Sequence, residues 1–329
     1  MKTLIIGAGP LGGLYATLLH QAGKNVTILA RNTYYHFLKE NGIVLVNEFT
    51  GEKTIEHLKL TRSLENEDPY DLGIVIMRKN SIKKLLPDLA KMKNIKHFLF
   101  MGNNASGFDE YLNYLPEEKI LFGFPGGGGS RIDHIVHYID SEKPHGKRMP
   151  VTLGEIDGII KPRTKEIQNL FKTSGIPVKI VNDIDSWLRY HVAFVLPVAG
   201  ALLTSGDNYK LAKDEETIRK YIRAVQEGGR VLRSLGWYKS YNIKFSLFNW
   251  LPEGMLIRIL KKVFNSKFAE VAMMMHVNAA TDEMLELENE FGKLKERSKM
   301  KTPNLDELLD SIYKNNVIEK IKSEKSITY

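Results

Sequence analysis

The sequence predicts an α/β protein in which a doubly wound parallel sheet is followed by an all-α C-terminal domain. Three observations support this. Short apolar runs alternate with helical patterns over residues 1–182, a glycine turn joins the first two runs, and long helical patterns replace strand signals from residue 183 onward. Alternating strands and helices are typical of a parallel sheet covered by helices. We therefore expect two domains, residues 1–182 and 183–329, with the boundary near residue 182.

The first thirty-one residues contain the clearest supersecondary unit. The apolar run Lys2–Ile6 meets Gly7 at once, which indicates a short buried strand. The next apolar residues have the three- and four-residue spacing of one helix face: Leu11, Leu14, Tyr15, Leu18 and Leu19. A second apolar run, Asn25–Ala30, predicts a second buried strand. Strand, glycine turn, helix and strand together form a βαβ unit.

The glycine turn of this unit has the spacing Gly7-Ala8-Gly9-Pro10-Leu11-Gly12. In such a turn Gly7 permits the tight bend, Gly9 lets backbone N–H groups approach a pyrophosphate, and Gly12 lets the helix pack on the strand. The N–H groups and the positive end of the helix dipole then face the phosphates. We therefore predict a dinucleotide site of the Rossmann type built by Gly7, Gly9, Pro10, Leu11 and Gly12. The alternative is a tight turn that binds no ligand.

The residue after the second predicted strand indicates which dinucleotide is bound. An acidic residue there would hold the ribose hydroxyls of NAD or FAD. This chain has Arg31 instead, and a guanidinium fork suits a 2′-phosphate. The prediction is NADP(H), with a flavin disfavoured. A solvated arginine at a strand end remains the alternative.

Further buried strands are predicted at Leu72–Met77, His97–Met101, Lys119–Gly123 and Val178–Val181. In doubly wound sheets, ligands bind beyond the carboxyl ends of the strands. Two more polar residues, Arg78 and Asn104, follow such ends. We expect both to lie near the cofactor.

Two later segments invite other interpretations. The run Gly126–Gly129 is not followed by Gly-Lys-Ser/Thr, so a nucleoside triphosphate loop is not expected. It is interpreted as a loop near the nicotinamide or as a linker. Residues 131–140 alternate like a single strand, which would place His134 and His137 on opposite faces. No metal site is therefore predicted there.

Composition narrows the class of protein. Of 329 residues, 43% are hydrophobic and 26% are charged, and the formal charge is +8. The basic residues are scattered, which favours attraction of a small anionic substrate and cofactor over nucleic-acid binding. The chain has no cysteine, so disulfides, thiolate chemistry and cysteine-bound metals are excluded.

No membrane segment is expected from the apolar stretches. The N-terminal apolar run is too short for a signal peptide. The stretch Phe245–Phe264 is interrupted by Pro252 and by several charged residues, so it is not expected to cross a bilayer. A cytoplasmic location is the default expectation.

In these motifs the chain resembles the ketopantoate reductase family, the NADPH-dependent 2-dehydropantoate 2-reductases. The resemblance runs from Met1 to about Tyr313 and rests on several marks in order: the glycine turn with Arg31, residues 103–107, Leu153-Gly154-Glu155, a helix beginning near Trp187 with Asp185-Ser186 as its cap, residues 227–232, and Thr302-Pro303. The resemblance implies a Rossmann domain, a helical substrate domain and an active site in the cleft between them. It also raises a role in pantothenate biosynthesis; a homodimer is a further open alternative.

The resemblance also implies catalytic residues. Asn104 corresponds to the family asparagine near nicotinamide and substrate, and Glu286 corresponds to the family glutamate. The family lysine is replaced by Arg189, which can stabilise charge and grip a carboxylate but is a poor acid. Two family asparagines and a serine fall at apolar residues: Ala193, Pro197 and Met274.

Four-residue spacing suggests that Asn278, Asp282 and Glu286 share one helix face. Such a polar stripe would line a cleft or face solvent, and the sequence leaves both readings open.

These residues predict an NADP(H)-dependent reductase of a small 2-oxo acid or a related carbonyl or imine. Because the family lysine is absent, ketopantoate itself is expected to be a poor substrate. The alternative is an NADP(H)-binding protein without efficient catalysis, such as a sensor or scaffold.

Overall fold

The computed structural model describes residues 1–64, 68–241 and 243–326. The chain divides into two compact units, and a short turn that interrupts unit 1 in sequence belongs to unit 2. Unit 1 comprises Met1–Asn103 and Gly107–Asp185, and unit 2 comprises Asn104–Ser106 and Ser186–Tyr329. Asn104, which follows a strand of unit 1 in sequence, therefore packs with the helices of unit 2.

Unit 1 is built on an eight-stranded sheet in the order β12-β11-β8-β7-β6-β1-β2-β5. The strands are β1 (Lys2–Ile6), β2 (Asn25–Leu29), β5 (Lys59–Thr61), β6 (Tyr70–Val75), β7 (Ile95–Met101), β8 (Ile120–Phe124), β11 (Val151–Gly154) and β12 (Val178–Ile180). All neighbours are parallel except β8 and β11. This confirms the predicted parallel α/β sheet, with β1 at the point where the strand order reverses.

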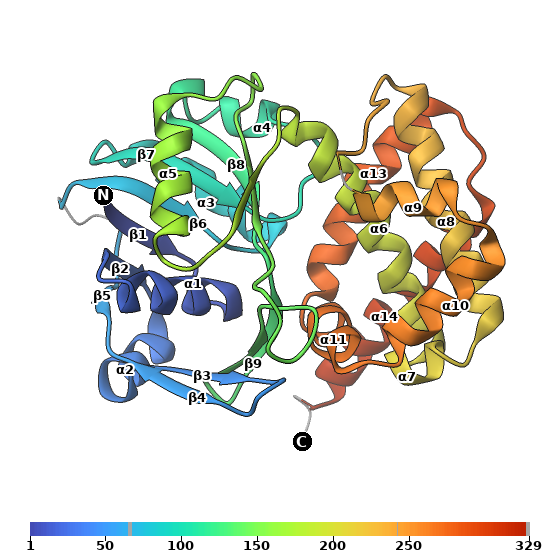
Figure 1. The fold of residues 1–329 in the computed structure, drawn as a ribbon, viewed down its shortest axis with the longest axis horizontal. Coiled ribbons are helices and arrows are strands. Elements are labelled where there is room, and N and C mark those ends of the chain that lie inside the picture. The colour runs from blue at the N-terminus through green and yellow to red at the C-terminus, as the bar shows by residue number, and fades with distance from the viewer. Residues whose placement is uncertain (65–67, 242, 327–329) are drawn as a thin grey trace. The chain divides into compact units, whose positions relative to one another are not determined.

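Helices cover both faces of this sheet (Figure 1). The helices of unit 1 are α1 (Pro10–Gln21), α2 (Asn32–Asn41), α3 (Lys79–Lys91), α4 (Asp109–Leu112) and α5 (Pro162–Lys172), with a 3₁₀ turn η1 (Glu117–Lys119). On one face Tyr15 of α1 meets Phe171 of α5 edge to face at 6.0 Å. On the other, Tyr111 of α4 packs against Phe100 of β7 at 4.9 Å. Because side chains alternate along β7, its odd and even residues supply the two cores.

A second, four-stranded sheet in unit 1 was not predicted. Its order is β4-β3-β10-β9, and its strands are β3 (Ile43–Asn47), β4 (Lys53–Glu56), β9 (Gly128–Ile132) and β10 (Ile135–Ile139). Strands β3 and β4 pair antiparallel.

Two predictions over β9 and β10 are wrong. Residues 131–140 are not one strand, because Asp133 and His134 turn the chain with φ of 47° and 68°. The run Gly126–Gly129 is not simply a loop, because β9 begins at Gly128. A Cβ at Gly129 would lie 2.2 Å from the carbonyl oxygen of His137, so the glycine serves close strand pairing.

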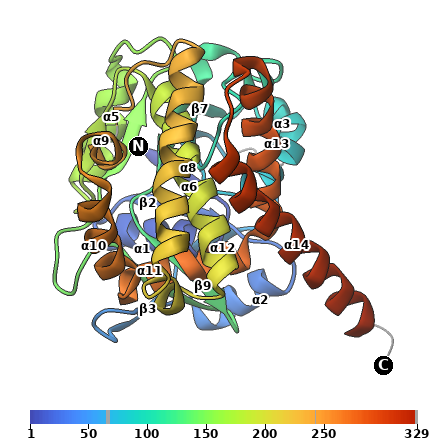
Figure 2. The same ribbon diagram turned by 90° about the vertical axis from the view of Figure 1, so that its right-hand side faces the viewer.

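Unit 2 is helical (Figure 2). Its elements are α6 (Ile184–Ser205), α7 (Asn208–Leu211), α8 (Glu215–Ser234), α9 (Ile243–Trp250), α10 (Glu253–Phe264), α11 (Lys267–Ala269), the π-helical turn η2 (Glu270–Met274), α12 (Met275–Ala279), α13 (Thr281–Ser298) and α14 (Pro303–Ser326). The predicted cap near Trp187 is wrong, since α6 already begins at Ile184 and Asp185 lies in its first turn.

The expected polar stripe is also wrong in part. The backbone leaves the helix at Ala280, with φ of −132° and ψ of 37°, so α12 ends before α13 begins. Asn278 is therefore on a different helix from Asp282 and Glu286. Only the latter two share one helix.

Helix α6 is the central element of the unit 2 core. It lies beside α8 (Figure 2), and a Cβ at Gly228 of α8 would lie 3.1 Å from the Cβ of Ala193. Within the described part of the chain, α6 alone is long and apolar enough to cross a membrane, and 67% of that stretch is buried. Burial in a helical core accounts for its apolar composition.

Candidate cofactor and active-site residues

The glycine turn between β1 and α1 has the geometry that its sequence predicts. Gly7 has a φ of +118°, and a Cβ there would lie 2.2 Å from the carbonyl oxygen of Ile76. A Cβ at Gly12 would lie 1.8 Å from the carbonyl oxygen of Gly7. Both positions therefore require glycine: Gly7 for the bend, and Gly12 for the approach of α1 to the turn.

Gly9 differs from these two glycines, because the space in front of it is open. It is the N-cap of α1, with φ of −79° and ψ of −174°, and a Cβ there would meet nothing within 4 Å. No side chain caps the helix, and Pro10 occupies its first turn. Backbone N–H groups at an uncapped helix start, beside open space, fit a pyrophosphate. The turn can therefore hold a dinucleotide.

The carboxyl end of β2 leads directly into α2. Arg31 is the N-cap residue of this helix, has an extended backbone, and is exposed. No side chain caps α2 either, so its first N–H groups remain available as donors, directly after the residue that carries the Arg31 guanidinium. This arrangement suits an added phosphate on the ribose.

The residue pair after β6 has two different environments. Arg78 is the exposed N-cap of α3, whereas the side chain of Lys79 is fully buried. Lys79 Nζ lies 3.2 Å from the Tyr111 hydroxyl and 3.4 Å from the Glu110 carboxylate. The sequence analysis missed this buried lysine, although a second cation directly after a buried strand could have signalled it. The paired carboxylate offsets the cost of burying the ammonium group.

In unit 2 the turn Asn104–Ser106 is held by a buried carboxylate and a buried guanidinium. Glu290 Oε2 of α13 accepts the N–H groups of Ala105 and Ser106 at 2.9 and 3.2 Å. Arg189 of α6 donates from Nη1 to the carbonyl oxygen of Ala105. Two oppositely charged side chains therefore bind the N–H and C=O groups of the same short turn.

Both charged side chains of this group are almost inaccessible to solvent. Arg189 is 6% exposed and Glu290 is 4% exposed. The guanidinium carbon of Arg189 lies 4.1 Å from the ring centroid of Trp237. Within the turn, Asn104 is 2% exposed, and its Oδ1 accepts the Ser106 hydroxyl at 3.0 Å. The amide NH₂ is the donor end of Asn104.

The glutamate expected at this site was Glu286. It lies one helical turn before Glu290 on α13 and is half-buried. The sequence analysis missed Glu290, and the only signal for it was the four-residue spacing that places it on the same side of the helix.

The other family positions lie in apolar surroundings. Ala193 is 1% exposed in the contact between α6 and α8, Pro197 is buried, and Met274 packs against the unit 2 core. An asparagine at Ala193 would need buried hydrogen-bond partners. Ala193 therefore suits the close contact between α6 and α8.

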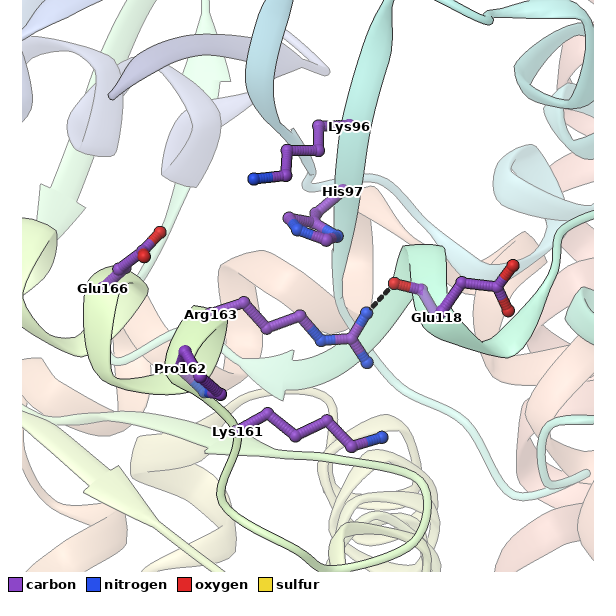
Figure 3. Close-up of a pocket in the computed structure, with 7 residues that line it drawn as sticks. All are labelled: Lys96, His97, Glu118, Lys161, Pro162, Arg163 and Glu166. Carbon is purple, nitrogen blue, oxygen red and sulfur yellow. Dashed lines mark hydrogen bonds between the residues drawn. The ribbon is translucent and has the colours of Figure 1, made fainter.

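A hollow of about 320 Å³ lies at the opposite, amino-terminal edge of the large sheet (Figure 3). It is lined by His97 near the start of β7 and by Arg163 in the first turn of α5. Arg163 is 8% exposed, and its Nε bonds to the Glu155 carboxylate at 3.2 Å. It also donates to the carbonyl oxygen of Glu118. Burial, with the nearby cation of Arg163, lowers the pKa of His97. These contacts neutralise the charges and join η1 to α5, which indicates a structural cluster.

Among the side chains that the structure describes, no three His, Asp or Glu residues are grouped as metal ligands. His134 stacks on Phe37 with ring centroids 4.7 Å apart. His137 Nδ1 lies 2.7 Å from the Glu48 carboxylate.

Comparison with known proteins agrees with this fold. The family model "Ketopantoate reductase PanE/ApbA" matches residues 3–142. A 2-dehydropantoate 2-reductase from Listeria innocua is 24% identical over 232 residues, covering 69% of this chain and 73% of the relative.

Two solved structures share the fold over most of the chain. That of 2-dehydropantoate 2-reductase from Geobacter metallireducens GS-15 has a TM-score of 0.76 at 16% identity, covering 96% of this chain and 100% of that one. A ternary structure of D-mandelate dehydrogenase with NADH and anilino(oxo)acetate has a TM-score of 0.76 at 18% identity, covering 95% and 97%.

Proposed function

We propose that this chain is a divergent member of the ketopantoate reductase family and that it reduces a small 2-oxo acid, or a related carbonyl or imine, with NADP(H). The family consists of oxidoreductases that act on CH–OH groups. The proposal that the cofactor is NADP(H) rests on two features. The start of α1 at Gly9 is open and uncapped, and Arg31 stands at the end of the next strand.

The proposed cofactor site lies in unit 1. The backbone of Gly7 to Gly12 would hold the pyrophosphate, with Pro10 and Leu11 shaping the start of α1. Arg31 and the first turn of α2 would hold a 2′-phosphate. Arg78 of unit 1, which follows β6, is proposed as a further contact. Asn104, which follows β7 but belongs to unit 2, is proposed as an additional contact from outside unit 1. When bound, the nicotinamide supplies the hydride for the reduction.

The proposed substrate contacts come from Asn104, Arg189 and Glu286. Reduction places negative charge on the carbonyl oxygen, and a donor aimed at that oxygen stabilises the charge. The amide NH₂ of Asn104 is the proposed donor. Arg189 is the proposed partner of the substrate carboxylate, because a guanidinium stays charged and matches a carboxylate bidentately. We retain Glu286 as a third polar contact.

The replaced family residues favour a substrate less polar than ketopantoate. An arginine side chain is a poor acid, and the side chains of Ala193 and Met274 offer no hydrogen-bond donors. The bond from Arg189 to the Ala105 carbonyl favours a second candidate, an NADP(H)-binding protein without efficient catalysis. Pantothenate biosynthesis is accordingly not assigned.

Product analysis with a panel of 2-oxo acids separates the two candidates. The protein is incubated with NADPH and each acid, and the 2-hydroxy acid is quantified against NADPH consumed. A reductase yields equal amounts of the two for at least one acid. NADPH binding without product from any acid would instead support the sensor or scaffold.

A homodimer and a cytoplasmic location stay predictions. Light scattering of the purified full chain measures its oligomeric state, and a monomeric mass would contradict the homodimer.

A further inference from the structure

Arg131 of β9 connects two parts of the cofactor site that are far apart in sequence. Its Nη1 donates to the carbonyl oxygen of Ala8, inside the glycine turn, at 2.9 Å. Its guanidinium carbon lies 3.9 Å from the ring centroid of Tyr34, in the first turn of α2. Arg131 therefore touches both the turn that suits a pyrophosphate and the helix that begins beside Arg31.

The hairpin that carries Arg131 is fixed at both ends. At its base, the Tyr15 hydroxyl of α1 donates to the carbonyl oxygen of Gly126 at 3.0 Å and accepts its N–H at 2.8 Å. At its tip, the His134 ring stacks on Phe37 and Tyr34 of α2, with centroids 4.7 and 5.7 Å apart. Arg131 is therefore presented from a rigid strand rather than from a loose loop.

The guanidinium is held in a defined plane while it remains exposed. Burial raises the pKa of Tyr34, so the ring beneath the guanidinium is a neutral phenol. A cation on an aromatic face is stabilised while its edge stays available to an anion. The α2 start then has two arginines: Arg31 as its N-cap, and Arg131 stacked on its first turn.

We propose that Arg131 is a second arginine for the 2′-phosphate of NADP(H), and that it sets the preference for NADP(H) over NAD(H) together with Arg31. The inference rests on the proposed function, since it concerns the same cofactor site. A 2′-phosphate dianion is the one group that NADPH has and NADH lacks. Two guanidinium groups beside an uncapped helix start offer that dianion charge and directed N–H donors.

The chain offers a matched control for this idea. Arg62 stacks on Tyr35, the next residue of α2, with its guanidinium carbon 4.1 Å from the ring centroid. It bonds to His36 at 3.2 Å and is exposed like Arg131. Arg62→Gln therefore removes the same charge and the same kind of stacking at a residue that bonds to His36 of α2, whereas Arg131 bonds to the glycine turn.

Calorimetric titration of NADPH, NADH and 2′,5′-ADP into the full chain tests the proposal. Arg131→Gln should weaken NADPH and 2′,5′-ADP binding by about 10- to 100-fold, the value of charge-assisted hydrogen bonds, and leave NADH close to the parent. The NADPH affinity of Arg131→Lys should lie between those of the parent and Arg131→Gln, because lysine keeps the charge but lacks the paired N–H donors of a guanidinium. Arg62→Gln should leave all three affinities close to the parent.

The outcomes separate this inference from the proposed function. A parent that binds neither dinucleotide overturns both. A parent that prefers NADPH, with Arg131→Gln binding NADPH equally well, overturns only the inference. Equal losses for NADPH and NADH in a variant with the parent's melting temperature would also overturn it, because the residue would then serve the shared part of the cofactor.

Discussion

The glycine turn of unit 1 and the Arg189 group of unit 2 are two polar sites built in opposite ways. The turn is local: Gly12 packs on Gly7, five residues earlier in the chain. The Arg189 group joins three distant segments, namely the turn 104–106, α6 and α13. A local motif depends on a few adjacent residues, whereas a distributed group can change one residue at a time. The turn can therefore be recognised from adjacent residues, whereas the Arg189 group is visible only in the fold.

The two sites also treat charge differently. Arg31 and Arg131 of unit 1 are exposed and can meet an incoming anion. Arg189 and Glu290 of unit 2 are 6% and 4% exposed, so their charges must be compensated within the fold. The unit 1 charges should therefore affect binding, and the unit 2 charges should affect stability as well as catalysis.

The largest expected effect is on the stability of unit 2. Glu290→Ala removes the acceptor of two backbone N–H groups, and each unsatisfied buried donor costs about 1–3 kcal/mol. All tryptophans (Trp187, Trp237 and Trp250) lie in unit 2, so urea unfolding followed by tryptophan fluorescence reports on that unit. Glu286→Ala, on the same helix but half-buried, is the control, and its free energy of unfolding should fall clearly less. Equal losses for the two variants would contradict the role given to Glu290.

The next effect concerns cofactor choice in unit 1. Arg31→Ala should cost about 1–3 kcal/mol in NADPH binding, the value of charge-assisted hydrogen bonds, and leave NADH little changed. Cofactor fluorescence gives both affinities. If the affinities for NADPH and NADH fall by the same factor, Arg31 does not hold the 2′-phosphate.

Alanine substitutions in the glycine turn distinguish effects on folding from effects on cofactor binding. Gly9→Ala meets no atom within 4 Å and has a backbone that alanine adopts, so the melting temperature should stay near the parent's. The methyl should instead occupy the space proposed for the pyrophosphate and weaken NADPH by at least about tenfold, or 1.4 kcal/mol. Gly12→Ala, with its Cβ 1.8 Å from the Gly7 oxygen, should lower the melting temperature. Full NADPH affinity in Gly9→Ala would contradict the proposed phosphate position.

The smallest expected change tests Arg189 as a carboxylate partner. Arg189→Lys should raise KM for 2-oxo acids by about tenfold through loss of the bidentate grip, while restoring a group able to donate a proton. Steady-state kinetics with the best acid from the panel measures both parameters. Parent values of kcat and KM in Arg189→Ala would show that this arginine acts only on the fold.

Local signals made most strands of the large sheet predictable, although β5 and β11 were not predicted. Each buried strand is a compact apolar run, and the glycines of the first turn occupy positions that other residues cannot. The β9–β10 hairpin was missed because its turn, Asp133-His134, contains no glycine or proline to mark it. The break at Ala280 lacks such a mark as well.

Site residues that depend on tertiary contacts were harder to predict. Arg131 reaches the glycine turn from 123 residues further along the chain. Glu290 differs from the expected Glu286 by one helical turn, which a sequence pattern alone does not resolve. Spacing specifies which residues share a face, and packing selects which of them meets a partner.

We propose that the chain binds NADPH in an intact site but has an altered catalytic group. Stopped-flow oxidation of protein-bound NADPH on mixing with ketopantoate measures both properties. We expect saturable NADPH binding followed by oxidation about 10²–10³ slower than usual, since one oxyanion donor is worth about that factor. Oxidation of ketopantoate at about 1–10³ per second, the ordinary range for enzymes, would contradict it.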